Sequence, residues 1–444
     1  LRANKQLPYK PLAVMVQAPP EKPLQHVTSS VCLSSDHSDL LLSPRRPIVL
    51  VNMQPGVDIS ALVSPGLDEI GIMLPYSPLH HLLLGDFGHP LVATSGNISG
   101  EPVLTDNDSV MQRLAPVVDA YLHHNRPIAR PADDPVYRFI NHRPRPQRTR
   151  RGNTPLELEL PCTLEQQVIA TGGHMKNTVA IAWDNRVVIS PHIGDLDSAR
   201  SRAVFERTID DLQSLYQVTA TAVICDAHPG YASTHWANSS GLPVHRVLHH
   251  HAHAATAYDF DAAGCPQLVF TWDGTGHGDD GTLWGGEALL GSPGQWTRVA
   301  SLRPFYLPGG ERAGREPWRS AAALCWESGH DWQDLPAGSD LLMQAWERRL
   351  NTPQSSAAGR LFDAAAALTG LCTHASYEGQ GPMLLEAAAD RYAPAMELPL
   401  TTGDDGLLRT DWKPLLSMLC DQGHSVAERS GCFHATLAEA LHAQ

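Results

Sequence analysis

The feature that most constrains the fold of this chain is a regular succession of strand and helix signals in its middle part. Three segments rich in apolar and β-branched residues come first: QVIATGG (167–173), TVAIAWD (178–184) and RVVISPHIG (186–194). Short apolar runs bounded by glycine, proline or polar residues are typical of strands. We therefore expect three consecutive strands here.

A helix and further strands follow. The predicted helix covers 198–217, and one face of it carries Phe205, Ile209, Leu212 and Tyr216. Next come a buried strand, TAVICDA (221–227), the histidine run VLHHHAHAA (247–255) on a predicted helix, and a strand that enters a glycine loop, QLVFTWDGTGHGDDG (267–281). The order strand-strand-strand-helix-strand-helix-strand is that of an actin-like ATPase lobe. It indicates an α/β fold and by itself no function.

The first part of the chain is organised differently. PLAVMV, RPIVLV and PLVATSG are predicted strands between loops rich in Pro, Gly and Ser, and PLHHLLLGDFG (78–88) is a predicted short helix that ends at glycine. An Arg/Pro-rich stretch and the segment LELELP follow from 141. Because 444 residues exceed one ordinary domain, we predict an α+β domain over 1–152, a linker over 153–165 and a second domain over 166–444.

Composition excludes several classes of protein. A formal net charge of −14 argues against a protein that coats nucleic acid with a generally basic surface. The chain has no run of 18 apolar residues and no apolar signal core at its start, and its eight cysteines are scattered singly. We therefore expect a soluble chain in a cytoplasmic setting. Both ends fall inside helical patterns, so we also expect a fragment that is truncated at both ends.

Three glycine turns are candidate phosphate-binding segments, because closely spaced backbone amides can hold an anion. The alternative for each is an ordinary hairpin turn. The first is ATGGHMKNT (170–178), the second is WDGTGHGDDG (272–281) and the third is LPGGERAG (307–314). The residues predicted to contact nucleotide phosphates here are Lys176, Asn177, Thr178, Gly274, Gly276, Gly309 and Gly310.

The histidine run is a candidate metal site. His249 and His253 are four residues apart, so a helix places them on one face, while His250 and His251 are expected to point elsewhere. Asp273, at the end of the next strand, is the expected third ligand. Two histidines and an aspartate suit iron and zinc equally. The alternative is that these are surface residues in a chain with 23 histidines.

A family resemblance joins these features. The later motifs that carry it are GGHMKNT, SPHIGDLD, CDAHPGYASTHWA, VLHHHAHAA, WDGTGHGDDGTLWGGE, LPGG, EPWR, SSAAGRLFDAAAALTG and SYEGQGPMLLE. The earlier ones are LRANKQLPYKPLAVM, SPRRPIVLV, IMLPYSPLHHLLL, ATSGNISGEPV and HNRPIARPADDPV. Together they closely resemble the hydrogenase-maturation carbamoyltransferases (HypF family). The resemblance implies a YrdC-like domain with a twisted mixed sheet, followed by an actin-like/ribonuclease H-like ATPase-fold metal domain.

The resemblance implies an enzyme, its substrates and a partner. ATP, with Mg²⁺, and carbamoyl phosphate would give carbamoyl-AMP and pyrophosphate. The carbamoyl group would then pass to the C-terminal cysteine of the partner maturation protein HypE, as the precursor of the cyanide ligands of nickel-iron hydrogenases. AMP is a leaving group that a thiolate can displace, and a closed path between domains would protect the intermediate from water.

The resemblance also implies roles for individual residues, although it identifies no catalytic residue. His249, His253 and Asp273 would hold one iron or zinc ion, and Lys176 with the glycine turns would hold nucleotide phosphates. Asp226 and His228 lie near the same strand ends, where a structural turn is the alternative. In the first domain, the nucleotide or carbamoyl group would be bound by Lys5, Lys10, Ser95, Asn97, Arg148, Arg150 and Arg151. The alternative for the arginines is a solvated linker.

Departures from the family pattern leave other readings open. Leu7 stands where the family has arginine, Pro135 where it has serine, and Asn153 where it has an aromatic residue. The family's acylphosphatase-like and zinc-finger parts and its last metal-ligating aspartate have no counterpart in the sequence. The alternatives are a small-molecule O-carbamoyltransferase, a tRNA threonylcarbamoylation protein with weak RNA binding by the basic stretch, and a non-catalytic scaffold that binds the partner protein.

Overall fold

A computed structural model describes residues 1–444 apart from 58, 99 and 263. The chain is a mixed α/β protein that divides into two compact units, unit 1 (Leu1–Arg246) and unit 2 (Val247–Gln444). The sequence places a boundary elsewhere, at 153–165. That predicted linker contains β7 (Leu156–Glu159), which pairs with β10 (Arg186–Ile189) in a sheet of unit 1. The predicted domain boundaries stay a prediction.

The first sheet of unit 1 has the strand order β4-β1-β3-β2-β5-β6. It is mixed, because β1 and β3 as well as β2 and β5 run parallel while the other pairs are antiparallel. Its strands are β1 (Ala13–Met15), β2 (Ile48–Asn52), β3 (Glu69–Met73), β4 (Leu91–Ala93), β5 (Val136–Ile140) and β6 (Arg143–Arg148). Their helices are α1 (Arg2–Lys5), α2 (Ser35–Leu42), α3 (Pro78–Phe87) and α4 (Asn107–Leu114).

The predicted strands and helix of this part are confirmed. β1 and β4 lie inside the predicted segments, and β2 extends one residue beyond its segment, to Asn52. In α3 the hydroxyl of Ser77 caps the first turn, Pro78 fits the first helical position, and Gly88 ends the helix in the left-handed conformation (φ 72°). The core packs around alternate strand residues such as Val49, Val51 and Ile70.

The Arg/Pro-rich stretch forms a strand as well. β6 has the sequence RPRPQR, is exposed along its whole length and pairs with β5 at the edge of the sheet. Proline lacks the N–H that a central strand donates on both sides, so an edge strand is where two prolines are tolerated. The alternative interpretation of this run as a solvated linker is therefore wrong for 143–148, which form a strand.

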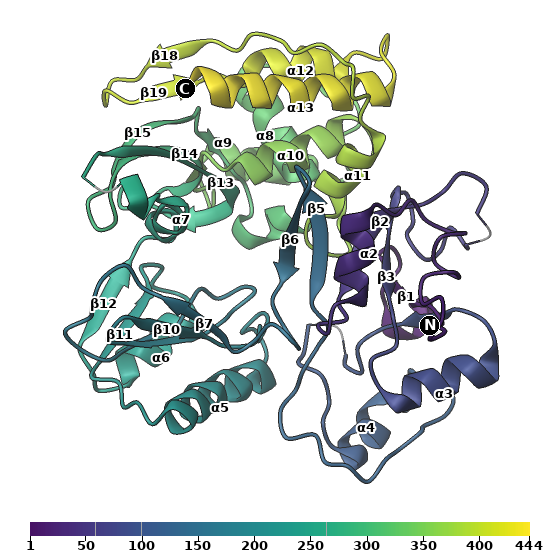
Figure 1. Ribbon diagram of the computed structural model, residues 1–444. Coiled ribbons are helices and arrows are strands. Elements are labelled where there is room, and N and C mark those ends of the chain that lie inside the picture. Colours follow the sequence, from purple (N-terminus) through teal and green to yellow (C-terminus); the bar gives the residue numbers. More distant parts are fainter. Residues whose placement is uncertain (58, 99, 263) are drawn as a thin grey trace. The chain divides into compact units, whose positions relative to one another are not determined.

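The second sheet of unit 1 contains the three predicted strands, the predicted helix and the strand predicted at 221–227, whereas α6 and β12 were not predicted. Its order is β12-β11-β8-β9-β10-β7, with β8, β9 and β10 as an antiparallel meander and β11 parallel to β8. The further elements are β8 (Val168–Ala170), β9 (Ala180–Trp183), α5 (Ala199–Tyr216), β11 (Ala222–Asp226), α6 (Ala232–Ser239) and β12 (Val244–Val247). The predicted apolar face of α5 packs on this sheet (Figure 1) through Phe205, Ile209 and Leu212.

Unit 2 contains a sheet with the order β16-β17-β14-β15-β19-β18, and β13 pairs with β14. Its strands are β13 (Gln267–His277), β14 (Leu283–Gly291), β15 (Thr297–Leu302), β16 (Phe305–Tyr306), β17 (Gln354–Ser355), β18 (Leu400–Thr402) and β19 (Leu408–Thr410). Its helices are α7 (His249–Ala257), η1 (Phe260–Ala262), η2 (Gly310–Gly314), α8 (Trp318–Ser328), α9 (Ser339–Glu347), α10 (Ala358–Leu368), α11 (Gln380–Ala388), α12 (Lys413–Cys420) and α13 (Val426–Ala443).

Two layers of helices build the core of unit 2. α8 and α10 pack against each other and carry runs of buried alanines, which let the helices approach closely. α12 and α13 lie outside them (Figure 1) and contribute Leu416, Phe433 and Leu437 to the same core. This packing holds the N-terminal end of α10 beside β13, where the candidate site lies.

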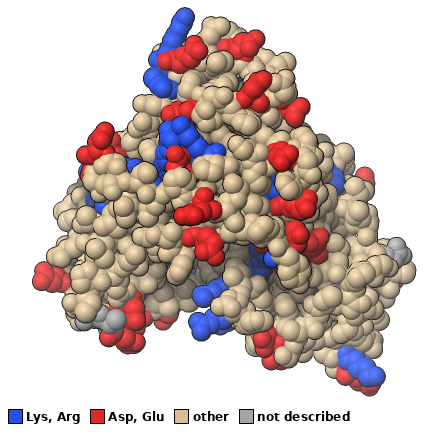
Figure 2. All heavy atoms as spheres, turned by 90° about the horizontal axis from the view of Figure 1, so that it is seen from above, with Lys and Arg blue, Asp and Glu red and all other residues tan. Residues whose placement is uncertain are grey.

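On the face seen in Figure 2, acidic and basic side chains are interspersed among uncharged ones. Among the described residues, no helix has the length and apolar composition that crossing a membrane requires.

Candidate functional site

The centre of the candidate site is the contact between helix α7 and strand β13 in unit 2. α7 begins at His249, so its first five residues contain all four histidines of the run. In β13 the pairing register with β14 shifts between Trp272 and Gly276, and Asp273 lies within this irregularity. Irregular strand segments of this kind redirect a side chain out of the normal alternation. The carboxylate of Asp273 therefore meets α7.

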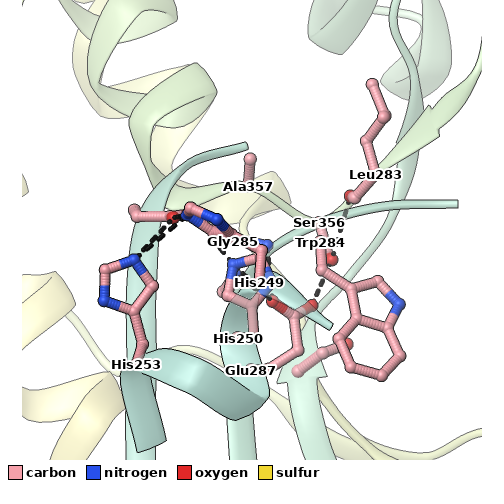
Figure 3. A network of polar contacts seen from close by, with 12 residues as sticks. His249, His250, His253, Leu283, Trp284, Gly285, Glu287, Ser356 and Ala357 are labelled. Atoms are coloured by element: carbon pink, nitrogen blue, oxygen red, sulfur yellow. Dashed lines mark hydrogen bonds and ion pairs between the residues drawn. The ribbon is translucent and has the colours of Figure 1, made fainter. Parts of the chain in front are cut away.

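Three side chains converge at this contact, and Figure 3 labels two of them, His249 and His253. His249 Nε2 lies 3.1 Å from Asp273 Oδ2 and 3.1 Å from His253 Nε2, and His253 Nε2 lies 3.5 Å from Asp273 Oδ2. Two ligand atoms that each lie about 2.0–2.2 Å from a shared ion are about 2.8–3.6 Å apart when the ligand–metal–ligand angle lies between a right angle and the tetrahedral angle. The arrangement of His249, His253 and Asp273 therefore has the dimensions of a metal site.

The candidate ligands differ in how much of each side chain is exposed to solvent. The His253 side chain is 50% exposed, whereas that of Asp273 is 21% exposed. Burial opposes ionisation of Asp273, but hydrogen bonds from His249, His250 and His253 outweigh it and hold the pKa of this carboxyl well below its usual range. An ion held here would face solvent on the His253 side, where water or a substrate oxygen can complete its coordination.

His250 departs from its predicted orientation. It is fully buried, and its Nε2 lies 3.0 Å from Asp273 Oδ1. The spacing rule for helices places His250 about 100° away from His249, but Asp273 has two oxygens and reaches both rings. His251 instead lies with its ring 6.3 Å from that of Trp284. Sequence reasoning missed His250, and its only signal was the same histidine run.

Gly276 allows the close approach of β13 to α7. A Cβ atom on Gly276 would lie 2.5 Å from His250 Cε1 and 2.9 Å from His249 Cβ. Gly274, predicted to have the same phosphate-binding role, has much more room, since its Cβ would meet only Arg360 Nη2, at 3.8 Å. The glycines of this loop therefore differ in what they do. Gly276 makes room for the histidines.

Arg360 is a phosphate-binding candidate that the sequence analysis left out. Its guanidinium lies between Gly274 and Gly314 of η2. A Cβ atom on Gly314 would be 3.2 Å from Arg360 Nη1. Arg360 also pairs with Asp363 one turn along α10 (Nη1–Oδ2 2.9 Å). The predicted Gly309–Gly310 turn enters η2, and both residues have positive φ (93° and 54°). The signal for Arg360 was the motif SSAAGRLFD, which contains it.

Replacing Asp363 with asparagine should change how stability depends on pH. Burial raises the pKa of Asp363 to about 6, although Arg360 opposes the shift. When the pKa of a carboxyl is higher in the folded than in the unfolded protein, its protonated form stabilises the fold. The stabilisation by protonated Asp363 is therefore fully present below the unfolded pKa of about 4 and is lost as pH rises through 6. From pH 4 to pH 7, the free energy of unfolding should therefore fall by about 2–3 kcal/mol more in the wild type than in Asp363→Asn.

Urea unfolding at pH 4 and pH 7, followed by tryptophan fluorescence, measures this difference, because Trp318 and Trp412 are buried in the same core. Asp331→Asn, at an exposed acid of unit 2, serves as the control. Equal pH dependence in wild type and Asp363→Asn would contradict the prediction.

In unit 1 the structure brings Lys5 together with Ser95 and Asn97. Lys5 Nζ donates to the backbone oxygen of Ser95 (2.6 Å) and to Thr94 Oγ1 (3.2 Å). The Ser95 hydroxyl donates to Asn97 Oδ1 (2.7 Å). The amide nitrogen of Asn97 in turn donates to Glu101 O (2.6 Å). The three predicted residues therefore form one connected group after β4.

A cationic cluster lies at the end of β6 in the same unit. Burial lowers the pKa of Lys10, and Arg148 and Arg150 lower it further, which places these charges within electrostatic reach of one another. Arg150 forms an ion pair with Asp133 and lies 3.2 Å from His192 Nδ1. Burial, with Arg150 and Arg148, lowers the pKa of His192 to about 3, so His192 is neutral near pH 7. Lys10, Arg148 and Arg150 are suited to an anion.

Arg151 is held differently. It pairs with Asp134 (Nη2–Oδ1 2.8 Å), donates to the backbone oxygens of Arg45 and Arg46, and stacks 3.6 Å over the centre of the Tyr76 ring. These contacts commit the guanidinium to the protein itself. Asp133 and His192 were missed in the sequence, although the motifs ADDPV and SPHIG contain them.

The predicted turn at 170–178 is braced by its own side chains. Asn177 is buried, and its amide nitrogen donates to Thr171 O (2.8 Å) and Gly173 O (2.6 Å). The backbone N–H of Lys176, which has a φ of 49°, donates to Asp195 Oδ1. Any phosphate contact here would therefore come from the Lys176 side chain, Thr178 or the backbone of the turn.

Asp226 and His228 stay close to each other after β11. The backbone N–H of His228 donates to Asp226 Oδ1 (2.8 Å), and the His228 ring stacks on Tyr231 with centroids 4.0 Å apart. This is the geometry of a structural turn, which was the alternative reading. These residues and the Lys176 turn belong to unit 1, whereas Gly274, Gly309 and the candidate metal ligands belong to unit 2.

Comparison with known proteins places each part of the chain. Residues 1–152 match the family described as "Telomere recombination", 163–259 match "HypF Kae1-like domain", and 269–444 match "Carbamoyltransferase, Kae1-like Domain, second subdomain". The chain is 37% identical to carbamoyltransferase HypF of Synechocystis sp. and 39% identical to that of Rhodobacter capsulatus. These alignments cover 96% and 100% of the chain but 58% and 60% of the two relatives, so the chain spans about three fifths of their length.

A solved structure shows the same likeness. The chain superposes with a TM-score of 0.93 and 32% identity on full-length HypF in a phosphate- and nucleotide-bound form. The superposition covers all of this chain and 70% of that protein. The likeness therefore extends over the fold as well as the sequence.

Proposed function

The chain belongs to the HypF family of carbamoyltransferases, and from this premise we propose that it acts in the maturation of nickel-iron hydrogenases. Its substrates are ATP, as the Mg²⁺ complex, and carbamate, which forms together with inorganic phosphate when water hydrolyses carbamoyl phosphate. A carbamate oxygen attacks the α-phosphorus of ATP, and pyrophosphate leaves. The thiolate of the C-terminal cysteine of the partner protein HypE then attacks the carbamoyl carbon of carbamoyl-AMP, and AMP leaves.

Unit 1 is the proposed adenylate-forming part. The single observation that carries this proposal is the connected group of Lys5, Ser95 and Asn97 after β4. The lowered pKa of Lys10, caused first by burial and then by Arg148, agrees with further positive charge in this unit. Triphosphate and the pyrophosphate that leaves are both highly anionic, and arginine guanidinium groups such as that of the largely buried Arg150 stabilise such anions. Next to Lys5, the second amide N–H of Asn97 is the neutral donor for a carbamoyl oxygen in this proposal, and the Ser95 hydroxyl, whose proton goes to Asn97 Oδ1, is an acceptor for the carbamoyl N–H.

Unit 2 is the proposed carbamoyl-transfer part. His249, His253 and Asp273 fit an iron or zinc ion by distance and by donor type. Such an ion supplies Lewis-acid polarisation of a carbonyl or phosphoryl oxygen when bound. Arg360 and the Gly309–Gly310 turn bind phosphate oxygens of the nucleotide in this proposal.

Exchange of labelled pyrophosphate into ATP tests the adenylation step. We expect exchange that depends on carbamate, supplied either as ammonium carbamate or as carbamoyl phosphate. The comparison of the two sources tells whether this chain also releases carbamate from carbamoyl phosphate. Lys10→Met should abolish exchange, whereas Lys22→Met, at an exposed lysine of the same unit, should leave it unchanged. A chain that binds HypE but supports no exchange from either source would be a non-catalytic scaffold.

The acceptor distinguishes two transferases. A peptide that ends in cysteine, with the sequence of the HypE terminus, should become carbamoylated, while an aminoglycoside should not. The opposite result would favour a small-molecule O-carbamoyltransferase. A cytoplasmic setting, which the singly scattered cysteines favour, is part of the proposal. RNA binding by the exposed arginines of β6 stays a side prediction.

A further inference from the structure

His250 is the buried neighbour of the candidate metal ligands. The ring is fully buried, and burial of an imidazole without a hydrogen-bond partner is costly. Its Nε2 lies 3.0 Å from Asp273 Oδ1. Because a carboxylate accepts hydrogen bonds, His250 Nε2 carries the proton of this bond. The other nitrogen, Nδ1, has no hydrogen-bond partner among the described residues, which fits an unprotonated Nδ1.

The two oxygens of Asp273 are thereby assigned to different neighbours. Oδ1 receives the N–H of His250, whereas Oδ2 lies 3.1 Å from His249 Nε2 and 3.5 Å from His253 Nε2. A free carboxylate rotates about its last bond and presents either oxygen. A donor fixed on Oδ1 selects the rotamer in which Oδ2 faces the two imidazoles.

Close packing keeps His250 in this position. Gly276 lies against the ring on one side, since a Cβ there would be 2.5 Å from His250 Cε1. On the other side of the carboxylate, a Cβ on Gly285 would be 2.9 Å from Asp273 Oδ1. Neither His250 nor Asp273 can therefore move far without displacing backbone.

A second buried carboxylate borders His250 and is already satisfied (Figure 3). Glu287 is fully buried, with its Oε2 4.0 Å from His250 Nε2. Its oxygens accept hydrogen bonds from the backbone N–H of Gly286 (2.6 Å), from Ser356 and from Arg298 (3.1 Å). Glu287 therefore does not compete for the proton of His250, and the hydrogen bond to Asp273 stays available.

We propose that His250 is a positioning residue that holds the carboxylate of Asp273 in the orientation required for metal binding. The inference rests on the proposed metal site and deepens it. Partners that orient metal ligands in this way typically contribute about 10–100-fold to metal affinity. The ligands themselves remain His249, His253 and Asp273.

Cobalt(II) titration of the full chain tests this inference, because the visible absorption of Co²⁺ reports both occupancy and coordination geometry. His250→Gln places an amide N–H near the position of Nε2, whereas the shorter His250→Asn cannot reach Asp273. We expect His250→Asn and His250→Leu to bind Co²⁺ about 10–100-fold more weakly, with an altered spectrum. His250→Gln should restore most of the affinity and the wild-type spectrum. His251→Gln, on the same helix, serves as the matched control.

The outcomes separate this inference from the proposed function. Wild-type affinity in His250→Asn, or equal affinities in the Gln and Asn variants, would overturn the positioning role while the metal site stands. Absence of Co²⁺ binding by the wild-type chain would overturn the metal site and the positioning role together. Far-UV circular dichroism of each variant establishes that it is folded. If His250→Leu fails to fold, the comparison of Gln with Asn still decides.

Discussion

His253→Ala should lower the affinity of the chain for Zn²⁺ by at least about 100-fold while leaving its fold intact. His253 supplies one of three converging ligand atoms, and two ligands hold an ion poorly. Its side chain is 50% exposed, so truncation removes little packing. Competition with a chromophoric chelator measures the affinity, and thermal unfolding without metal measures the fold.

The matched control for this change is His251→Ala, two residues away on the same helix. His251 is outside the group of possible ligands, and its ring faces Trp284. A loss of Zn²⁺ affinity of similar size in both variants would mean that α7 binds metal as a histidine-rich segment. In that case the site formed with Asp273 would be wrong. In the pyrophosphate-exchange assay, His253→Ala should retain activity, because the proposed adenylation residues lie in unit 1.

Gly276→Ala should destabilise unit 2 by about 1–3 kcal/mol and also weaken metal binding. The new methyl group would lie 2.5 Å from the buried ring of His250 and 2.9 Å from the Cβ of His249, so β13 and α7 have to separate. That separation moves Asp273 away from both imidazoles. Thermal unfolding and Zn²⁺ titration of the same sample measure the two effects.

Gly274→Ala is the control for this prediction, since it lies in the same loop. Its Cβ would meet only Arg360 Nη2, at an ordinary contact distance of 3.8 Å, and its φ is not in the left-handed region. We therefore expect near wild-type stability from Gly274→Ala. Comparable losses in both alanine variants would indicate that backbone flexibility of the loop, and not room for the histidines, is what the glycines provide.

Several elements could be predicted because their causes are local. The helix α3 begins at a serine cap and ends at Gly88, and both signals stand in the sequence. The meander of β8, β9 and β10 and the buried face of α5 follow from the periodicity of apolar residues. β3 and β5 were missed, and β6 was predicted only as part of a basic segment. A pattern such as RPRPQR becomes a strand because a partner, β5, is available at the sheet edge.

The candidate site was predictable in its ligand types and not in its supporting residues. His249 and His253 are one helical turn apart, and this spacing alone puts them on one face. His250 was predicted to point away from the site, but its ring contacts Asp273. Helix geometry predicts which residues share a face, and it does not predict which carboxylate oxygen a side chain contacts. Arg360 lies 86 residues after Gly274 in the chain, and the sequence contains no signal that the two meet.

By itself, the sequence determined some of the elements, the family and which three side chains are the candidate ligands, because propensity, capping and motif spacing act over a few residues. The tertiary structure alone decided which oxygen of Asp273 faces the imidazoles, which glycine makes room for them, and that Arg151 and Asn177 are committed to the protein's own groups. These outcomes depend on which surfaces meet when helices and strands pack. Such contacts between distant parts of a chain are set by shape and satisfied hydrogen bonds, which no local pattern encodes.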